Sequence, residues 1–338
     1  MDFDAAVIKN APTACKGILT SVGMCGSVIV GVAIGLPALS PFAAFGSLLA
    51  MNITPRHGAK AKIIGALAGC LFLLLAASLS RAIAGYPLFA LVFLFILSWL
   101  AALPRKELAY LGFVAKFAAV AVLLSFFDFT PSLLLAVYFC GGILFGICLS
   151  LANMAFEKED QQSPLEQLRE LLHGDTNNIY FSLIIPVTVV ISTLLAELFT
   201  YSEPAWVGLT IIFVANADIT LEFRRLMDRI VGTIVGAFMS YLVLDHIHQP
   251  LQLALVVGIL AFFIPFVVKH YSIFSFLMTC IVLILIDIAM FSHGGAMRLL
   301  FWRCLDTVSG CICVLVANIV LALIYRARKQ HENSASKN

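Results

Sequence analysis

The sequence predicts an all-α integral membrane protein with about twelve transmembrane helices, arranged as two parallel six-helix repeats. Three observations favour this fold class. First, 62% of the 338 residues are hydrophobic and only 12% are charged, and the mean hydropathy is +1.02. Second, long apolar runs follow one another with few polar stretches between them. Third, the second half holds a short apolar run, a charged turn and a glycine-containing helix from Pro204 to Gly236. The same order occurs in weaker form from Pro41 to Gly69. Such a chain has too little polar surface to cover a soluble globule of its size.

Each apolar run has the length and composition of a transmembrane helix, which needs about 20 apolar residues. The runs are rich in Leu, Ala and Phe and lack the alternation that is typical of membrane β-strands. No A-x-A-like cleavage site follows the first run, so we expect it to be retained as a span. The expected helices are 17–36, 39–53, 62–81, 86–103, 108–127, 131–156, 179–199, 204–217, 229–246, 250–268, 273–292 and 298–326.

The chain divides into two halves at its longest polar stretch. Six spans in each half make both halves enter the membrane in the same direction, as parallel repeats. The expected division is residues 1–156 as the first repeat, 157–178 as a cytoplasmic linker, 179–326 as the second repeat and 327–338 as a polar tail.

The linker has the pattern of a short amphipathic helix. Ser163 is a capping residue, Pro164 suits the first helical position and Glu166 completes a capping box. Four leucines then fall on one face, and Gly174 is placed to end the helix. We expect a connector that covers the cytoplasmic face of the bundle, and a regulatory role is the alternative.

Basic residues concentrate on one side of this topology. Opposite that side, the odd-numbered turns hold only Arg81 and, at the edge of the last span, Arg298. Positive residues favour the cytoplasmic side of a membrane, so both termini are expected in the cytoplasm. The termini and the even-numbered turns hold Lys9, Lys16, Arg56, Lys60, Lys62, Arg105, Lys106, Lys158, Arg169, Arg224, Arg225, Arg229, Lys269, Arg326, Arg328, Lys329 and Lys337.

Several function classes are disfavoured. The net charge of +2 comes without a basic stripe interleaved with aromatic residues, so nucleic-acid binding is not expected. Nine cysteines lie almost all within apolar runs and form no C-x-x-C motif, which is typical of small buried residues. No phosphate loop, G-x-S-x-G elbow or H-E-x-x-H motif occurs, so we expect neither an enzyme nor a cofactor. The turn Asp245-His246-Ile-His248 lacks a further metal ligand, so we expect a solvated turn and no metal site.

Two short spans occupy corresponding places in the halves. The second and eighth spans each begin with a proline and end near an asparagine, Asn52 and Asn216. Short segments at matching places in two repeats indicate a central binding site, with simple packing as the alternative. A helix with small residues at four-residue spacing follows each of them, and these faces let helices approach closely. The glycines concerned are Gly65, Gly69, Gly232 and Gly236.

Three motifs of the second half resemble the fusaric acid resistance and aromatic acid exporter family of bacterial inner-membrane proteins. They are Pro204-x-Trp206-x-x-x-Thr210, Arg229-x-x-Gly232-Thr233-x-x-Gly236 and Arg303-x-x-Asp306-Thr307-x-x-Gly310. The resemblance implies efflux of small, often aromatic, carboxylic acids, usually with a periplasmic adaptor protein of the membrane-fusion type. Plant malate channels resemble the same superfamily, so a channel remains an alternative.

The resemblance is faint in the first half. Lys62 stands in the place of Arg229, and Ala66 in the place of Thr233. When Asn153 is aligned with Asn318, Tyr138 and Gly141 fall opposite Arg303 and Asp306. The longer relatives also carry cytoplasmic domains that this chain replaces with a linker and a tail. The charged side of an anion site is therefore expected in the C-terminal half.

Charged residues inside apolar runs are the candidates for function, because a charge at the membrane centre costs about 2.5–3.5 kcal/mol on insertion scales. Arg303 and Asp306 lie three residues apart and can pair along one helix face. A structural pair is one interpretation. In the other, Arg303 attracts an anionic substrate, with Arg229, while Asp306 holds its guanidinium. The expected substrate-binding set is Arg303, Arg229, Trp206, Asn216 and Asn52.

Asp287 is the candidate for proton coupling, together with Asp306. Asp287 has no basic neighbour within a helical turn, so burial would disfavour its charged form. A carboxyl group that is hydrogen-bonded inside the bundle, or faces periplasmic water, is the alternative. Lys116 lies in the middle of an apolar run and suits either contact with an anion or an extended position that brings its amine to water.

The sequence as a whole favours a proton-coupled inner-membrane exporter of small organic carboxylic acids that works with an adaptor. An organic-anion channel would use the same arginines but no protonatable carboxylate. A membrane subunit without transport activity, within an efflux assembly, is the third hypothesis. The sequence determines neither the substrate nor the oligomeric state, for which a homo-oligomer is one alternative.

Overall fold

The chain is helical throughout the part that a computed structural model describes, which is residues 3–335 except 53–57, 84, 103–108, 128–131, 154–178, 200, 202–203, 215–218, 269 and 291–295. The described residues form twelve α-helices and one 3-10 turn, with no strand among them. This confirms the all-α class. The elements are α1 (Phe3–Ala33), η1 (Pro37–Leu39), α2 (Ser40–Asn52), α3 (Ala59–Ala82), α4 (Pro87–Ala102), α5 (Ala109–Phe127), α6 (Leu133–Asn153), α8 (Ile179–Leu198), α9 (Ala205–Val214), α10 (Ile219–His246), α11 (Pro250–Val267), α12 (Tyr271–Met290) and α13 (Ala296–Ala335).

Each of the twelve apolar runs coincides with one helix, but three helices extend beyond their runs by more than three residues. Helix α1 begins at Phe3, α10 begins at Ile219, and α13 continues to Ala335. Hydropathy finds only the apolar part of a helix, because charged residues such as Arg and Lys are themselves good helix formers. Arg229, expected at the start of a span, therefore lies ten positions inside α10. The linker 157–178 lies outside the described residues.

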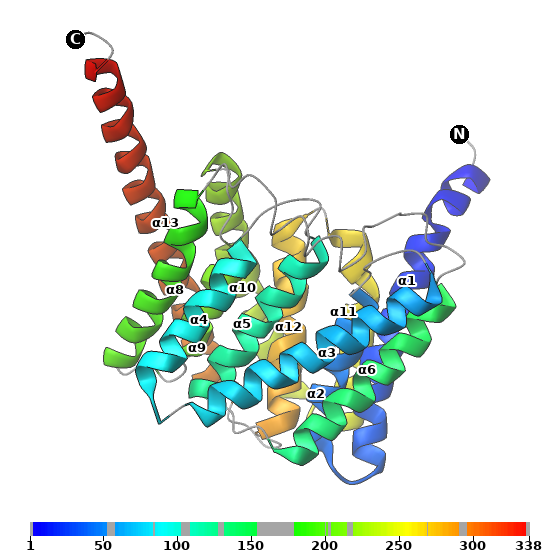
Figure 1. The fold of residues 1–338 in the computed structure, drawn as a ribbon. Helices are drawn as coiled ribbons and strands as arrows, with labels where there is room; N and C mark the ends of the chain where they lie inside the picture. The colour runs from blue at the N-terminus through cyan, green and yellow to red at the C-terminus, as the bar shows by residue number, and fades with distance from the viewer. Residues whose placement is uncertain are drawn as a thin grey trace.

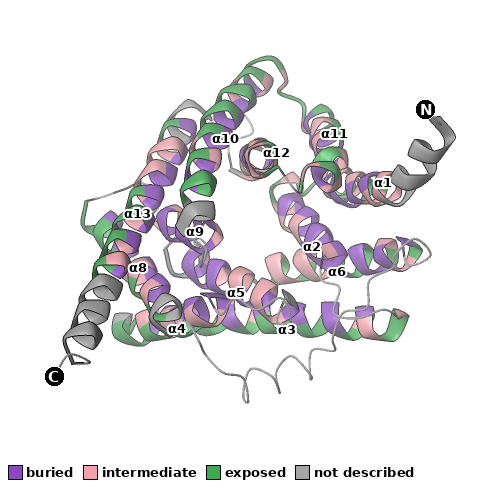
Figure 2. Ribbon diagram, turned by 90° about the horizontal axis from the view of Figure 1, so that it is seen from above, coloured by how far each residue is buried: buried purple, intermediate pink, exposed green. Residues whose placement is uncertain are grey.

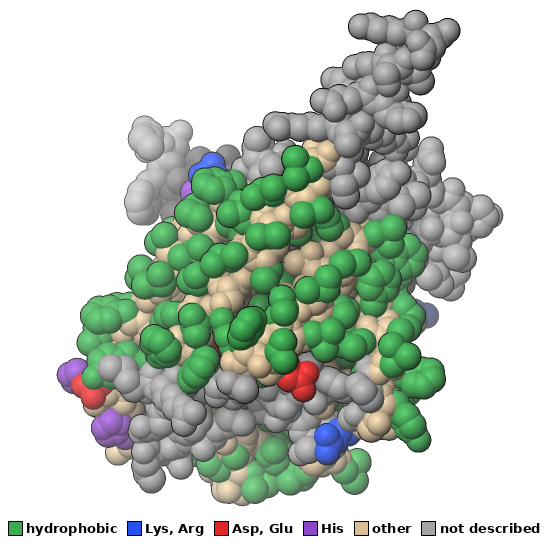
Figure 3. Space-filling model, turned by 90° about the vertical axis from the view of Figure 1, so that its left-hand side faces the viewer, with side chains coloured by type: hydrophobic (Ala, Val, Ile, Leu, Met, Phe, Trp, Pro, Cys, Tyr) green, Lys and Arg blue, Asp and Glu red, His purple; other side chains and the backbone are tan. Residues whose placement is uncertain are grey.

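Among the described residues, seven helices are long and apolar enough to cross a membrane by length and composition, and four shorter helices are also apolar. Large hydrophobic side chains cover the outer surface, as the broad apolar face in Figure 3 shows. On α10 this exposed face includes Phe223, Val231 and Phe238. A soluble protein rarely exposes continuous apolar surface of this kind. The chain is thus a multi-pass membrane protein.

The two short helices predicted at α2 and α9 are present and lie inside the bundle. Helix α9 has 10 residues, which span about 15 Å, or roughly half of a hydrocarbon core of about 30 Å. Every residue of α9 except Trp206 and Phe213 is buried. Neighbouring helices, not lipid, therefore surround α9, so it does not need the length of a full span.

The start of α1 and the end of α13 lie at the same end of the bundle (Figure 1).

Helices α5 and α12 are also enclosed. Seen from above, α12 stands almost end-on within the bundle, with α10 on one side and α2 and α11 on the other (Figure 2). No described residue of α12 after Ile273 is exposed, and none of residues 110–125 of α5 is exposed. Helix α5 packs against α3, α4 and α9, while α12 packs against α10, α11 and α2.

Close packing at the motif glycines joins α10 to α12. A Cβ atom built on Gly232 would lie 2.6 Å from the carbonyl oxygen of Ser272, and one on Gly236 would lie 2.9 Å from that of Phe276. Both distances are shorter than van der Waals contact allows. The close approach expected from these two glycines is therefore confirmed, and it fixes which faces of α10 point toward α12 and α13.

Candidate functional site

Arg303 and Trp206 form the centre of the candidate site. Arg303 lies near the start of α13 and is only 4% exposed. Its guanidinium carbon stands 3.7 Å from the centroid of the Trp206 ring, in the first turn of α9. A guanidinium over an aromatic face is an attractive cation–π arrangement, worth about 2 kcal/mol or more where water is excluded. The tertiary structure thus brings two of the predicted substrate-binding residues together.

Asp306 adds a second buried charge to the same helix. It is fully buried, and it follows Arg303 by three residues on α13. Thr307, also buried, donates its hydroxyl hydrogen to the carbonyl oxygen of Arg303 at 2.9 Å. Charges of both signs at this depth are costly unless each is compensated. The site therefore combines a buried cation and a buried carboxyl group of α13 with an aromatic face from α9.

The contact between α9 and α13 sets the position of Trp206. A Cβ atom on Gly310 would lie 2.8 Å from Thr210 Cβ and 3.0 Å from the carbonyl oxygen of Val207, so only glycine allows this approach. The Thr210 hydroxyl in turn donates to the carbonyl oxygen of Trp206 at 2.9 Å. Thr210 and Gly310, both motif residues, hold α9 against α13 one to two turns away from the Arg303 stack.

Other aromatic residues, which lie outside the three sequence motifs, surround this end of α13. The Tyr201 ring lies 5.8 Å from the Trp302 ring, centroid to centroid, and its hydroxyl is 2.9 Å from the Ser309 hydroxyl. Tyr201 precedes Pro204 by three residues, so an aromatic residue close to the motif was the available signal. Its contact with α13 depends on tertiary packing, which sequence spacing does not give.

Arg229 does not join the Arg303 site. It is 7% exposed, and it lies within electrostatic range of both Tyr271 and Cys311. Cys311 is eight residues beyond Arg303, which corresponds to about 12 Å along a helix. In agreement, Ala237 of α10, eight residues after Arg229, packs in a cluster with Cys304 of α13. The two arginines therefore occupy different levels of the bundle.

The remaining candidates lie elsewhere. Asp287 is partly buried, close to the end of α12, and His248 lies within electrostatic range of it. Sequence spacing did not reveal this basic neighbour because His248 belongs to the segment after α10. Asn52 donates its side-chain amide to the carbonyl oxygen of Leu48 at 2.8 Å, within its own helix. Asn216 lies outside the described residues.

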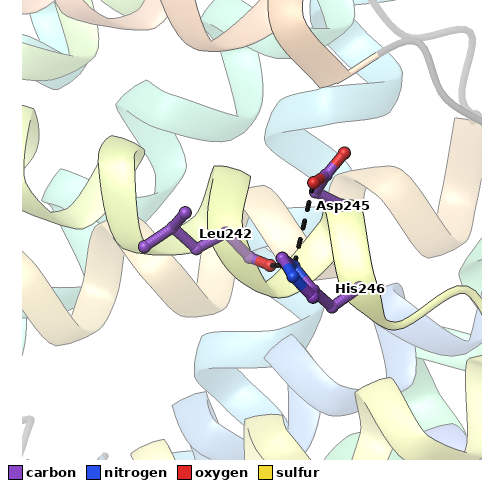
Figure 4. Close-up of polar contacts among 3 residues, drawn as sticks. All are labelled: Leu242, Asp245 and His246. Carbon is purple, nitrogen blue, oxygen red and sulfur yellow. Dashed lines mark hydrogen bonds and ion pairs between the residues drawn. The ribbon is translucent and has the colours of Figure 1, made fainter.

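The turn after α10 has no metal-binding arrangement among the described residues. His246 Nδ1 stands 3.8 Å from an Asp245 carboxylate oxygen and 2.9 Å from the carbonyl oxygen of Leu242 (Figure 4). Both side chains are more than half exposed. Across the described part of the chain, no group of three or more His, Cys, Asp or Glu side chains is placed to hold a metal ion.

Comparison with known proteins supports the predicted resemblance. Residues 190–317, which include Trp206, Arg229, Arg303 and Asp306, match a family model described as fusaric acid resistance protein-like. An uncharacterized protein of Synechocystis is 32% identical over 133 residues, which are 38% of this chain and 16% of that protein. An uncharacterized protein of Haemophilus influenzae is 31% identical over 126 residues, which are 37% of this chain and 17% of that protein. The chain therefore matches only about a sixth of either relative. No solved structure matches it.

Proposed function

We propose, from the likeness of residues 190–317 to the fusaric acid resistance protein-like family, that this chain exports small organic carboxylates across the inner membrane of a bacterium. The observation that carries this proposal is the buried Arg303 guanidinium, which stacks on Trp206. Arg303 lies three residues before the buried Asp306 on the same helix. A buried cation with an aromatic face beside it suits an anion that has a flat apolar body. Aromatic acids are the substrates with this chemistry.

Stacking on Trp206 involves the face of the Arg303 guanidinium and not its edge. Arginine has five N–H donors in its plane, and a carboxylate accepts two of them side by side. The Trp206 ring covers the face of the guanidinium, so a carboxylate would approach along the edge. In a site that excludes water, this charge-assisted contact is stronger than at an exposed surface. Asp306 would orient Arg303 and limit its affinity, so that the substrate can leave.

We also infer that the two halves are parallel repeats that move against each other. In the first half α2 packs on α6 and α3 on α5, and in the second half α9 packs on α13 and α10 on α12. The contacts between the halves correspond too, because α1 packs on α11 and α4 on α8. Rocking of one repeat against the other is a common way to expose a central site to alternate sides of the membrane.

Transport into proteoliposomes tests the proposal. Purified protein would be reconstituted and supplied with radiolabelled benzoate, with or without an imposed pH gradient. An exporter coupled to protons should accumulate benzoate above the external concentration, and a protonophore should abolish the accumulation. Flux that only follows the benzoate gradient would instead favour a channel. Failure of any organic anion to move would favour a membrane subunit without transport activity, and an adaptor of the membrane-fusion type would then be added.

Asp287 is the residue that we propose for proton coupling. Asp287→Asn should abolish accumulation against a gradient while it leaves benzoate exchange between equal concentrations intact, because asparagine cannot release a proton. Asp245→Asn, which changes a well-exposed carboxylate in the neighbouring turn, is the matched control and should behave like the unchanged protein. Full accumulation by the Asp287→Asn protein would exclude this residue from coupling.

A further inference from the structure

A group of basic side chains lies around Tyr271, in the part of the bundle where α12 begins. The guanidinium carbon of Arg225, on α10, is 5.9 Å from the centroid of the Tyr271 ring. Arg229, one turn further along α10, lies within electrostatic range of Tyr271. Lys116 of α5 is within electrostatic range of Arg225. The Tyr271 hydroxyl also donates to the carbonyl oxygen of Phe213, at 3.5 Å, which links the group to the end of α9.

Arg229 is the buried member of this group. Its side chain is 7% exposed, and its Nε atom has no hydrogen-bond partner among the described residues. Within the same part of the chain, no carboxylate forms an ion pair with Arg229, Arg225 or Lys116. Cations that are drawn together repel one another, and a buried donor without an acceptor costs about 1–3 kcal/mol. An anion placed here would remove both costs.

Polar groups continue from Arg229 toward the level of Arg303. Thr233, one turn further along α10, has a buried hydroxyl oxygen without a hydrogen-bond partner among the described residues. The same holds for Thr279, which packs beside Gly236 from α12. Ala237, at the next level of α10, belongs to the hydrophobic cluster against which Cys304, the neighbour of Arg303, packs. Among the described residues, hydroxyl groups without a hydrogen-bond partner thus lie between the levels of the two arginines, and these levels are about 12 Å apart along the bundle.

We propose that Arg229, with Tyr271, Arg225 and Lys116, forms a second anion-binding site for the carboxylate group of the transported substrate. This inference rests on the proposed function and adds a separate binding site to the transport path of the substrate. The exposed Arg225 would attract the anion, Arg229 would bind it, and the hydroxyl groups of Thr233 and Thr279 would donate to it on the way to Arg303. Several sites of moderate strength let an ion enter and also leave, which a single tight site would prevent.

Equilibrium binding tests this without any need for flux. The protein in lipid nanodiscs would be titrated with radiolabelled benzoate. We expect two equivalents for the unchanged protein, one each for Arg229→Gln and Arg303→Gln, and none for the double variant. Arg224→Gln is the matched control, because it removes an exposed arginine next to Arg225 on the same helix, and it should leave both equivalents. Tyr271→Phe should weaken one of the two sites at least about threefold, since it removes the hydroxyl group that links this site to α9.

Two further variants keep the result decisive if Arg229→Gln folds poorly. Arg229→Lys retains the charge and should keep the second equivalent at lower affinity. Lys116→Gln should lower the affinity of the Arg229 site and leave that of the Arg303 site unchanged. The proposal is overturned if Arg229→Gln keeps both equivalents, if the unchanged protein binds one equivalent that depends only on Arg303, or if it binds none. Loss of one equivalent in Arg229→Gln, together with no benzoate flux by the unchanged protein, would support this site and reject the transport function.

Discussion

Replacement of Arg303 by glutamine is expected to lower benzoate flux in proteoliposomes by roughly 10- to 100-fold. A hydrogen bond to a charged group contributes about 1.5–3 kcal/mol, and glutamine cannot supply the paired charged donors of arginine. Glutamine also loses the cation–π contact with Trp206 that orients the side chain. The measurement is the initial rate of radiolabelled benzoate uptake, normalised to the amount of correctly folded protein.

Three further variants separate substrate binding from a structural role of Arg303. Arg303→Lys keeps the charge but not the flat fork of donors, so an intermediate flux is expected. Arg303→Gln leaves Asp306 buried without its nearest cation along α13, and the double variant with Asp306→Asn should regain stability but not flux. Recovery of flux in the double variant would instead mean that the two residues are a structural pair. Flux of Arg303→Gln equal to that of the unchanged protein would refute the proposed site.

Substitution of Gly142 by alanine is expected to be the most damaging change in the first half. A Cβ atom there would collide with the backbone of α2, at the carbonyl group of Ala43, and would stand 2.7 Å from the Cα atom of that residue. Backbone atoms cannot move aside as a side chain can, so α2 and α6 would have to separate. Overpacking of this kind typically costs about 1–3 kcal/mol or more, and we expect a lower melting temperature of the purified protein.

The neighbouring glycine provides an unusually close control. Gly141 lies in the same helix, and a Cβ atom there would meet nothing within 4 Å. Gly141→Ala should therefore leave the melting temperature unchanged or raise it slightly, because alanine is the better helix former. Equal melting temperatures for Gly141→Ala and Gly142→Ala would show that the contact between α2 and α6 is looser than described.

Most of the fold was predictable because hydropathy and helix length are properties of consecutive residues. The positions of all twelve helices followed from the apolar runs, and the proline and asparagine pattern located the two short inner helices. The start of α10 was misplaced by ten residues, since Arg224, Arg225 and Asp228 reduce hydropathy without interrupting a helix. The same misplacement put Arg229 at the first position of its helix, although it lies ten residues inside α10.

The candidate site was predictable only as a set of residue types. Charges inside apolar runs identified Arg303, Asp306 and Lys116, and the motifs identified Trp206 and Arg229. Tyr271 and Arg225 were not among the candidates, because an aromatic residue at a helix start and a basic residue in a polar segment are common. Their shared position depends on how α10 and α12 pack against each other and on where α5 lies, which sequence spacing does not give.

The amino-acid sequence by itself determined that this protein is a helical membrane protein, where its helices lie and which charges they carry. The tertiary structure alone decided that Arg303 stacks on Trp206 while Arg229 stands about two helical turns away beside Tyr271. The physical reason is that these contacts depend on how closely α9 and α10 approach their neighbours. That approach is set by glycines such as Gly310 and Gly232, whose partners come from other helices.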